Sequence, residues 1–302
     1  MAGKDITEKT LIAYNDVFAD IINVLLFGGK RIVKENELQD AVARSMYKAD
    51  GRLHEMERDT AKYWRQTRFR IALIGIENQT DPDPDMALRL FGYDGAGYRA
   101  QLLANKKNKK VEQRKRRYPV ISLVLYFGST RWTEKKTLKE SVQILPELEP
   151  FVNDYKINLF EISFLSDEQV AMFRSDFRFV AEFFVKQRTD PGYTPTKIEI
   201  RHVDEMLKLL SVFSGDERFL DFVNKQAEEE KGEKKIMSSA VLDFREARGE
   251  ARGEAKGKAE GKAEGQDLLV EAVQRFRAGE TAESIIKSGI DEDTVRRALT
   301  IL

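Results

Sequence analysis

The chain contains no cysteine and only two histidines, His54 and His202, among its 302 residues. Without cysteine there is no disulfide framework and no thiolate metal site. Two imidazoles are too few for the usual zinc centres and give no Ser-His-Asp arrangement. A phosphate-cradling glycine loop is also missing. These absences exclude thiol chemistry and argue against a zinc enzyme.

Long apolar runs and excess charge of one sign are absent too. No apolar stretch reaches the ~18 residues needed to span a bilayer, and the first nine residues lack the apolar centre of a signal peptide. Basic and acidic residues balance at 51 each, so any affinity for nucleic acid must come from a local patch. With 34% charged residues, we expect a long solvated segment somewhere in the chain. We therefore expect a soluble, cytoplasmic protein.

What the sequence does contain is an alternation of helical and extended patterns. Apolar residues at three- and four-residue spacing predict a first helix over 8–27, and near-continuous apolar runs predict buried strands. Residues 35–55 are polar and are expected to form a loop with a short helix. The predicted strands are 57–64, 69–79, 118–127 and 155–164, the first two as an antiparallel pair. The other predicted helices are 86–103, 167–187 and 203–226. This order predicts a mixed α/β fold.

Carboxylates gather at the end of one predicted strand. Glu77 and Gln79 lie two residues apart, so both side chains leave the same face of the strand. Asp59 belongs to the neighbouring predicted strand. Carboxylates brought together in this way form a hard oxygen site for Mg²⁺, which can activate water and stabilise a phosphate.

These motifs resemble a known nuclease core. The segments 14–23, 57–59, 77–79 and 118–121 are similar to the PD-(D/E)xK nuclease superfamily and, more narrowly, to the recombination-promoting nuclease (Rpn) family of transposase-like proteins. The resemblance implies a PD-(D/E)xK-like mixed sheet flanked by helices. It also implies a metal-dependent DNA endonuclease, linked to recombination or a mobile element, with Mg²⁺ or in its place Mn²⁺ as the cofactor.

The resemblance assigns roles to individual residues. Asp59 and Glu77 would bind the metal, the backbone carbonyl of Asn78 would be a further ligand, and Gln79 would orient the attacking water. The superfamily pattern has Lys where this chain has Gln79. An amide can hold a water or a phosphate oxygen but supplies no positive charge.

Two carboxylates of the first predicted helix are further candidates. Asp16 and Asp20 lie four residues apart, hence on one face of that helix. In related enzymes this helix often adds a carboxylate near the metal, so one of the two is expected to complete the site. The alternative is a solvated flank of an amphipathic helix, and the sequence leaves both interpretations open.

A strongly basic segment, 106–117, precedes the strand predicted at 118–127. Such a run contacts a phosphate backbone without reading sequence, although many charge runs are only solvated loops. Beside a candidate phosphodiesterase site, DNA contact is the favoured interpretation. The basic residues are Lys106, Lys107, Lys109, Lys110, Arg114, Lys115, Arg116 and Arg117.

The composition changes near Glu228. We divide the chain into a nuclease-like domain over 1–226, a charged Gly/Ala/Glu/Lys repeat linker over 227–266 and a helical hairpin tail over 267–302. The tail has the spacing of a helix-turn-helix. Its second helix, however, begins with Asp291, Glu292 and Asp293, whose charges would repel phosphate. Packing or self-association into a homo-oligomer is therefore favoured over base reading.

The sequence thus predicts a DNA endonuclease as its first function. A catalytically reduced DNA- or partner-binding module that keeps the fold is the alternative. A scaffold that self-associates through its tail is a third candidate.

Overall fold

The computed structural model describes residues 10–41, 44–49, 52–66, 69–107, 117–190, 199–221, 236–237 and 268–301. The chain divides into two compact units, Met1–Val241 and Leu242–Leu302. The predicted linker, 227–266, lies almost wholly outside the described residues.

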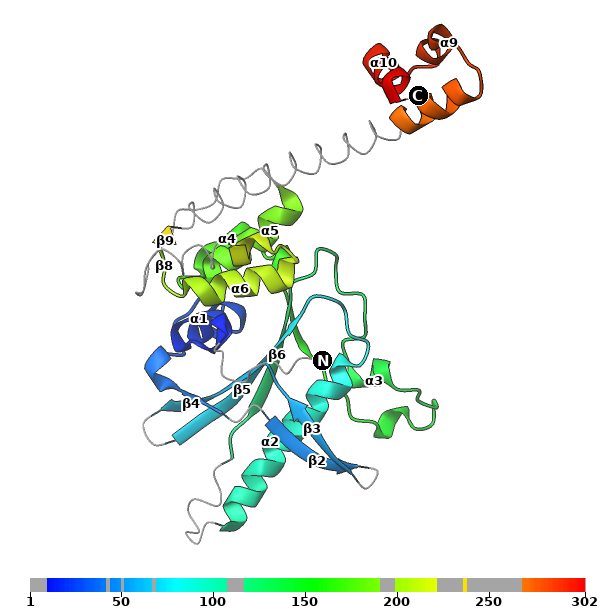
Figure 1. Cartoon of the computed structure of the whole chain (residues 1–302). Coiled ribbons are helices and arrows are strands. Elements are labelled where there is room, and N and C mark those ends of the chain that lie inside the picture. The colour runs from blue at the N-terminus through cyan, green and yellow to red at the C-terminus, as the bar shows by residue number, and fades with distance from the viewer. Residues whose placement is uncertain are drawn as a thin grey trace. The chain divides into compact units, whose positions relative to one another are not determined.

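A five-stranded mixed sheet forms the centre of the first unit (Figure 1). Its strand order is β1-β4-β5-β6-β7. The pairs β1–β4 and β4–β5 are antiparallel, whereas β5–β6 and β6–β7 are parallel. The strands are β1 (Leu38–Asp40), β4 (Thr60–Gln66), β5 (Phe69–Gln79), β6 (Val120–Tyr126) and β7 (Asn158–Glu161). Two small pairings lie outside this sheet: β2 (Arg44–Ala49) with β3 (Arg52–Glu57), and β8 (Glu199–Ile200) with β9 (Ile236–Met237).

The antiparallel pair β4–β5 contains an irregularity. Trp64 pairs with Ala72 and Arg65 pairs with Arg70, so β5 has one residue more than β4 between these two positions. This is the two-against-one count of a β-bulge. From Trp64 to Thr60 the pairing is regular, and it ends with Thr60 opposite Ile76.

Helices cover both faces of the sheet (Figure 1). The ammonium of Lys62 lies 5.8 Å from the ring centroid of Phe18, which places α1 on the face that also carries Ile74 and Ile76. Helix α2 covers the opposite face, where the Cα of Gly97 approaches Leu73 and Val120. The helices of this unit are α1 (Asn15–Leu25), α2 (Met86–Lys107), α3 (Leu138–Ser141), α4 (Asp167–Met172), α5 (Phe177–Thr189) and α6 (Val203–Ser214).

The fold class predicted from the sequence is confirmed: the structure is mixed α/β with a PD-(D/E)xK-like arrangement of sheet and helices. The loop predicted within 35–55 was wrong, because β1 and most of the β2–β3 hairpin lie there, whereas a short 3-10 helix is present at Glu35–Glu37. The helix predicted over 167–187 is two helices, α4 and α5, interrupted at residues 173–176. Within the described residues, no helix is both long and apolar enough to cross a bilayer.

The second unit is a small cluster of short helices. Residues 268–277 are helical and end before Gly279, whose φ is 91°. Helices α9 (Ala282–Lys287) and α10 (Glu292–Ile301) follow, separated by Gly289 with a φ of 105°. Positive φ is a conformation that glycine adopts at little cost. The buried residues of this unit are Ala272, Ile285, Ile290, Val295 and Ala298. The helical hairpin predicted for the tail is therefore present.

Candidate active site

The carboxylates of Asp59 and Glu77 are brought together by the register of one hairpin. Because Thr60 pairs with Ile76, the next position of the register puts Asp59 opposite Glu77. The Oδ2 atom of Asp59 accepts a hydrogen bond from the backbone N–H of Asn78 at 2.8 Å and one from its side-chain amide at 3.2 Å. These bonds hold the exposed carboxylate of Asp59 against the end of β5.

Glu77 differs from Asp59 in its burial. Its side chain is 2% exposed. Burial, together with the neighbouring charge of Asp59, raises the pKa of the Glu77 carboxyl to about 8, while the charges of Arg89 and Arg58 oppose the change. A desolvated carboxylate next to a second carboxylate is typical of functional sites.

The oxygen atoms at this edge suit a hard divalent cation. Oε1 of Glu77 and Oδ1 of Asn78 are both buried and accept no hydrogen bond. Orphaned buried oxygens of this kind require a compensating partner. Carboxylate and amide oxygens are the donors that Mg²⁺ prefers. Among the described residues, no group of three or more His, Cys or acidic side chains could hold a metal.

Two arginines approach Glu77 from the α2 face. Nη2 of Arg89, in the first turn of α2, lies 3.7 Å from Oε2 of Glu77. The charge of Arg58, which precedes Asp59 in the chain, also acts on Glu77. The side chain of Arg58 passes over Gly75, where an added Cβ would meet its Cδ atom at 2.7 Å. Glycine at position 75 therefore leaves the space that Arg58 occupies.

Arg58 belongs to a buried polar network that sequence analysis missed. Its Nη2 donates to Oδ1 of Asp94 in α2 at 2.8 Å, and both side chains are less than 10% exposed. Ser122 of β6 donates to the same oxygen at 2.6 Å, and the Tyr155 hydroxyl donates to Oδ2 at 2.7 Å. Glycine inside a predicted strand often marks a close approach, so Gly75 was the signal that could have revealed Arg58.

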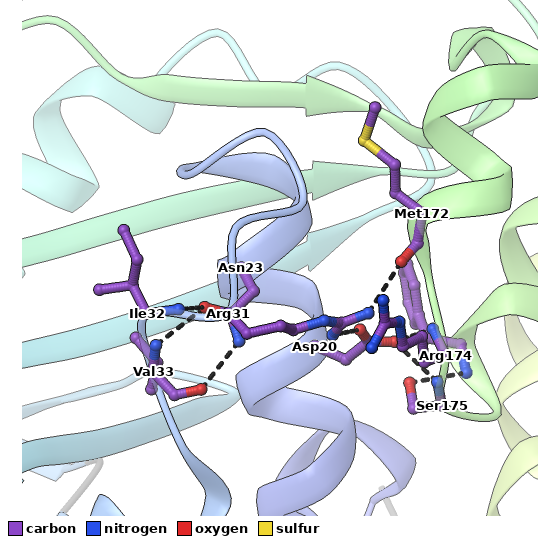
Figure 2. A network of polar contacts seen from close by, with 9 residues as sticks. Asp20, Asn23, Arg31, Ile32, Val33, Met172, Arg174 and Ser175 are labelled. Carbon is purple, nitrogen blue, oxygen red and sulfur yellow. Dashed lines mark hydrogen bonds and ion pairs between the residues drawn. The ribbon is translucent and has the colours of Figure 1, made fainter.

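Asp20 has a different set of partners (Figure 2). It is 3% exposed, forms an ion pair with Arg31 and accepts hydrogen bonds from the backbone N–H groups of Arg174 and Ser175, both at 2.7 Å. Asp16 lies 3.2 Å from Nε2 of His202. Helix α1 covers the sheet face opposite to the one that carries Glu77. The structure therefore does not bring Asp16 or Asp20 together with Asp59 and Glu77.

Replacing Asp20 by Ala is expected to destabilise the protein without altering its affinity for a divalent metal. The change removes the acceptor of two backbone N–H groups and the partner of Arg31, at a cost of about 3 kcal/mol. Urea denaturation measures the stability, and titration calorimetry with Mn²⁺ measures the affinity. Asp59→Ala is the comparison, because its loss should weaken metal binding with little change in stability. A large loss of metal affinity in a stably folded Asp20→Ala protein would contradict this assignment.

Comparison with known proteins bears on the same region. Residues 71–189 match the model of a family described as putative transposase, YhgA-like. Over this segment the chain is similar to the YhgA-like transposase family. The family is of the Rpn and PD-(D/E)xK type and points to a function related to mobile elements. Searches of the curated proteins and of the solved structures found no match.

The YhgA-like segment contains Glu77 and Arg89, whereas Asp59 precedes it by twelve residues. Gln79 also belongs to it and is the last residue of β5, where strand alternation puts its side chain on the face of Glu77. Its backbone carbonyl accepts a hydrogen bond from Phe127 at 2.8 Å.

The basic segment predicted to contact DNA lies within the YhgA-like match but mostly outside the described residues. Lys106 and Lys107 end helix α2, and the exposed Arg117 precedes β6. The positions Lys109, Lys110, Arg114, Lys115 and Arg116 are not among the described residues. DNA contact by this segment stays a prediction.

Proposed function

We propose that this protein is a metal-dependent DNA endonuclease that hydrolyses phosphodiester bonds with Mg²⁺, or with Mn²⁺ in its place. The observation that carries the proposal is the pairing of Asp59 with the buried Glu77 at the end of one hairpin, next to oxygens that lack partners. The similarity of residues 71–189 to a transposase-like family supports a substrate of DNA and a role linked to recombination or a mobile element.

In this proposal Asp59, Glu77 and an oxygen of Asn78 would hold the metal. Bound Mg²⁺ would polarise the scissile phosphate and lower the pKa of the attacking water. Gln79, on the same strand face as Glu77, would orient that water by hydrogen bonding. The water oxygen would attack phosphorus and release one proton to solvent, while the bond from phosphorus to one ester oxygen breaks and the leaving oxygen takes up a proton from solvent. The burial of Glu77 keeps bulk water away from one side of the reacting groups.

One observation favours a second function, a DNA-binding module that has lost cleavage. The described acidic ligands number only Asp59 and Glu77, and Gln79 carries no charge. In that case the hairpin would keep the fold and the DNA surface while the chemistry is absent. The two functions differ in cleavage but not in binding.

The deciding experiment is cleavage of supercoiled plasmid by the full chain in Mg²⁺, in Mn²⁺ and in a chelator. The variants are Asp59→Ala and Glu77→Ala, with Asp85→Asn as the control because it alters an exposed carboxylate eight residues from Glu77. We expect nicking by the wild type and the control, and a loss of at least about 1000-fold in both site variants. Equal cleavage by all four proteins would reject the site. Salt-sensitive DNA binding without any cleavage would select the binding module.

A further inference from the structure

Among the described residues at the candidate site, Arg89 combines positive charge with access to solvent. Its side chain is 40% exposed, and its Nη2 lies 3.7 Å from the Glu77 carboxylate. Arg58 also acts on Glu77, but it is 6% exposed and its guanidinium is engaged with Asp94. Among the described residues whose charges act on Glu77, only Arg89 could therefore reach a substrate.

The guanidinium of Arg89 is held in place before any substrate arrives. Its Nη1 forms an ion pair with Oδ2 of Asp83, and its side chain also hydrogen-bonds with Tyr93. The other carboxylate oxygen of Asp83 accepts the backbone N–H of Asp85 at 2.8 Å, just before α2 begins. Asp83 is thus fixed to the backbone, and Arg89 is fixed to Asp83. Little side-chain entropy remains to be lost when such an arginine binds an anion.

Glu77 and Gln79 supply no positive charge at this edge of the sheet. Phosphodiester hydrolysis develops negative charge on the phosphate oxygens, and Gln79 on the Glu77 face is neutral. A guanidinium presents a planar fork of donors that matches two phosphate oxygens. Nη2 of Arg89 is close to Glu77, so an anion at the candidate metal site lies within reach of the same fork.

We propose that Arg89 binds a non-bridging oxygen of the scissile phosphate and supplies the positive charge that Gln79 cannot. This rests on the proposed nuclease function, since the phosphate is positioned by the same carboxylates. Arg89 would turn from Glu77, whose charge a bound metal neutralises, toward the substrate, while Asp83 keeps it at the site. It would then be a catalytic residue that touches the reacting group.

The kinetic test compares Arg89→Ala and Arg89→Lys with Arg99→Ala in the plasmid assay. Arg99 is an exposed arginine of the same helix, so its replacement removes an equal charge elsewhere on α2. We expect kcat to fall about 100-fold in Arg89→Ala, as on loss of one transition-state donor, and to change little in Arg99→Ala. Arg89→Lys should recover part of the loss, because it keeps the charge without the fork. Equal rates for Arg89→Ala and Arg99→Ala would overturn the proposal while leaving the nuclease function standing.

A second readout is independent of cleavage. Binding of a short DNA duplex is measured with Ca²⁺, a hard cation that takes the same oxygen ligands as Mg²⁺, over a series of salt concentrations, for the wild type and the same three variants. Loss of one phosphate contact should reduce the slope of log K against log salt by about 0.9 in Arg89→Ala and leave it unchanged in Arg99→Ala. If the wild type binds DNA but does not cleave it, this slope alone tests the phosphate contact of Arg89. An unchanged slope in Arg89→Ala would then reject the contact. If the wild type neither binds nor cleaves DNA, both proposals are wrong.

Discussion

Replacing Glu77 by Gln is expected to stabilise the metal-free protein at alkaline pH and to abolish cleavage at the same time. Burial raises the pKa of Glu77 from about 4.5 to about 8, so the folded protein binds this proton more tightly than the unfolded chain does. The free energy of unfolding therefore falls as the pH rises between these two values. A neutral amide of the same shape does not carry this penalty.

The expected size follows from the same linkage. Below about pH 4.5 both proteins carry a neutral group, and their stabilities should agree. Above about pH 8 the difference levels off at a gain on the order of 5 kcal/mol for Glu77→Gln. Urea denaturation across this range, in the presence of a chelator, measures the difference.

Metal gives the matched control for this prediction. Mg²⁺ should raise the melting temperature of the wild type, because it compensates the buried carboxylate, and should have little effect on Glu77→Gln. A stability difference that does not change with pH would show that Glu77 is not the group that titrates. A response to Mg²⁺ that survives the substitution would place the metal elsewhere.

Replacing Asp94 by Ala is expected to be among the most destabilising single changes in the first unit. Its carboxylate accepts hydrogen bonds from Arg58, Ser122 and Tyr155, three donors from separate parts of the chain. Removing it leaves the guanidinium of Arg58 buried without its counter-charge. Breaking a buried ion pair on one side costs about 3–5 kcal/mol. The measurement is the midpoint and slope of urea unfolding.

A double change separates the lost charge pair from lost packing. Asp94→Ala leaves the buried charge of Arg58 without its partner, and Arg58→Met removes that charge. The double variant should therefore be more stable than Asp94→Ala alone. Tyr155→Phe, which removes a single hydroxyl from the network, should cost only about 1 kcal/mol. If Asp94→Ala lowers the free energy of unfolding no more than Tyr155→Phe does, the network contributes far less to stability than its geometry indicates.

The sequence predicted the parts of the fold that depend on local periodicity. The near-continuous apolar run before Glu77 predicted β5, and the two-residue spacing predicted that Glu77 and Gln79 share a face. It did not predict the break between α4 and α5. The backbone N–H groups of Arg174 and Ser175 bind Asp20 there, more than 150 residues away in the chain. A contact of that range leaves no local pattern.

In the candidate site, too, the sequence predicted what depends on local structure and missed what depends on long-range packing. Asp59 and Glu77 could be paired from the sequence because one hairpin joins them, although their role in metal binding is still a prediction. Arg89 and Asp94 were not predicted, since what brings them to Glu77 and Ser122 is the packing of α2 on the sheet rather than spacing along a strand. In the sequence alone, polar residues of a helix that contact the sheet have the same pattern as polar residues that face solvent.

The bulge in the β4–β5 hairpin has a consequence for the kinds of mutation that the protein tolerates. Residue 71 is the additional residue of β5 between the pairs Trp64–Ala72 and Arg65–Arg70. Deleting one residue between the bulge and Asp59 would shift Asp59 by one position along β5 and turn its side chain to the other face of the sheet. A substitution in this hairpin changes one side chain and leaves the register of β4 and β5 intact. Single-residue insertions and deletions there should be lost from any functional library, however conservative their composition.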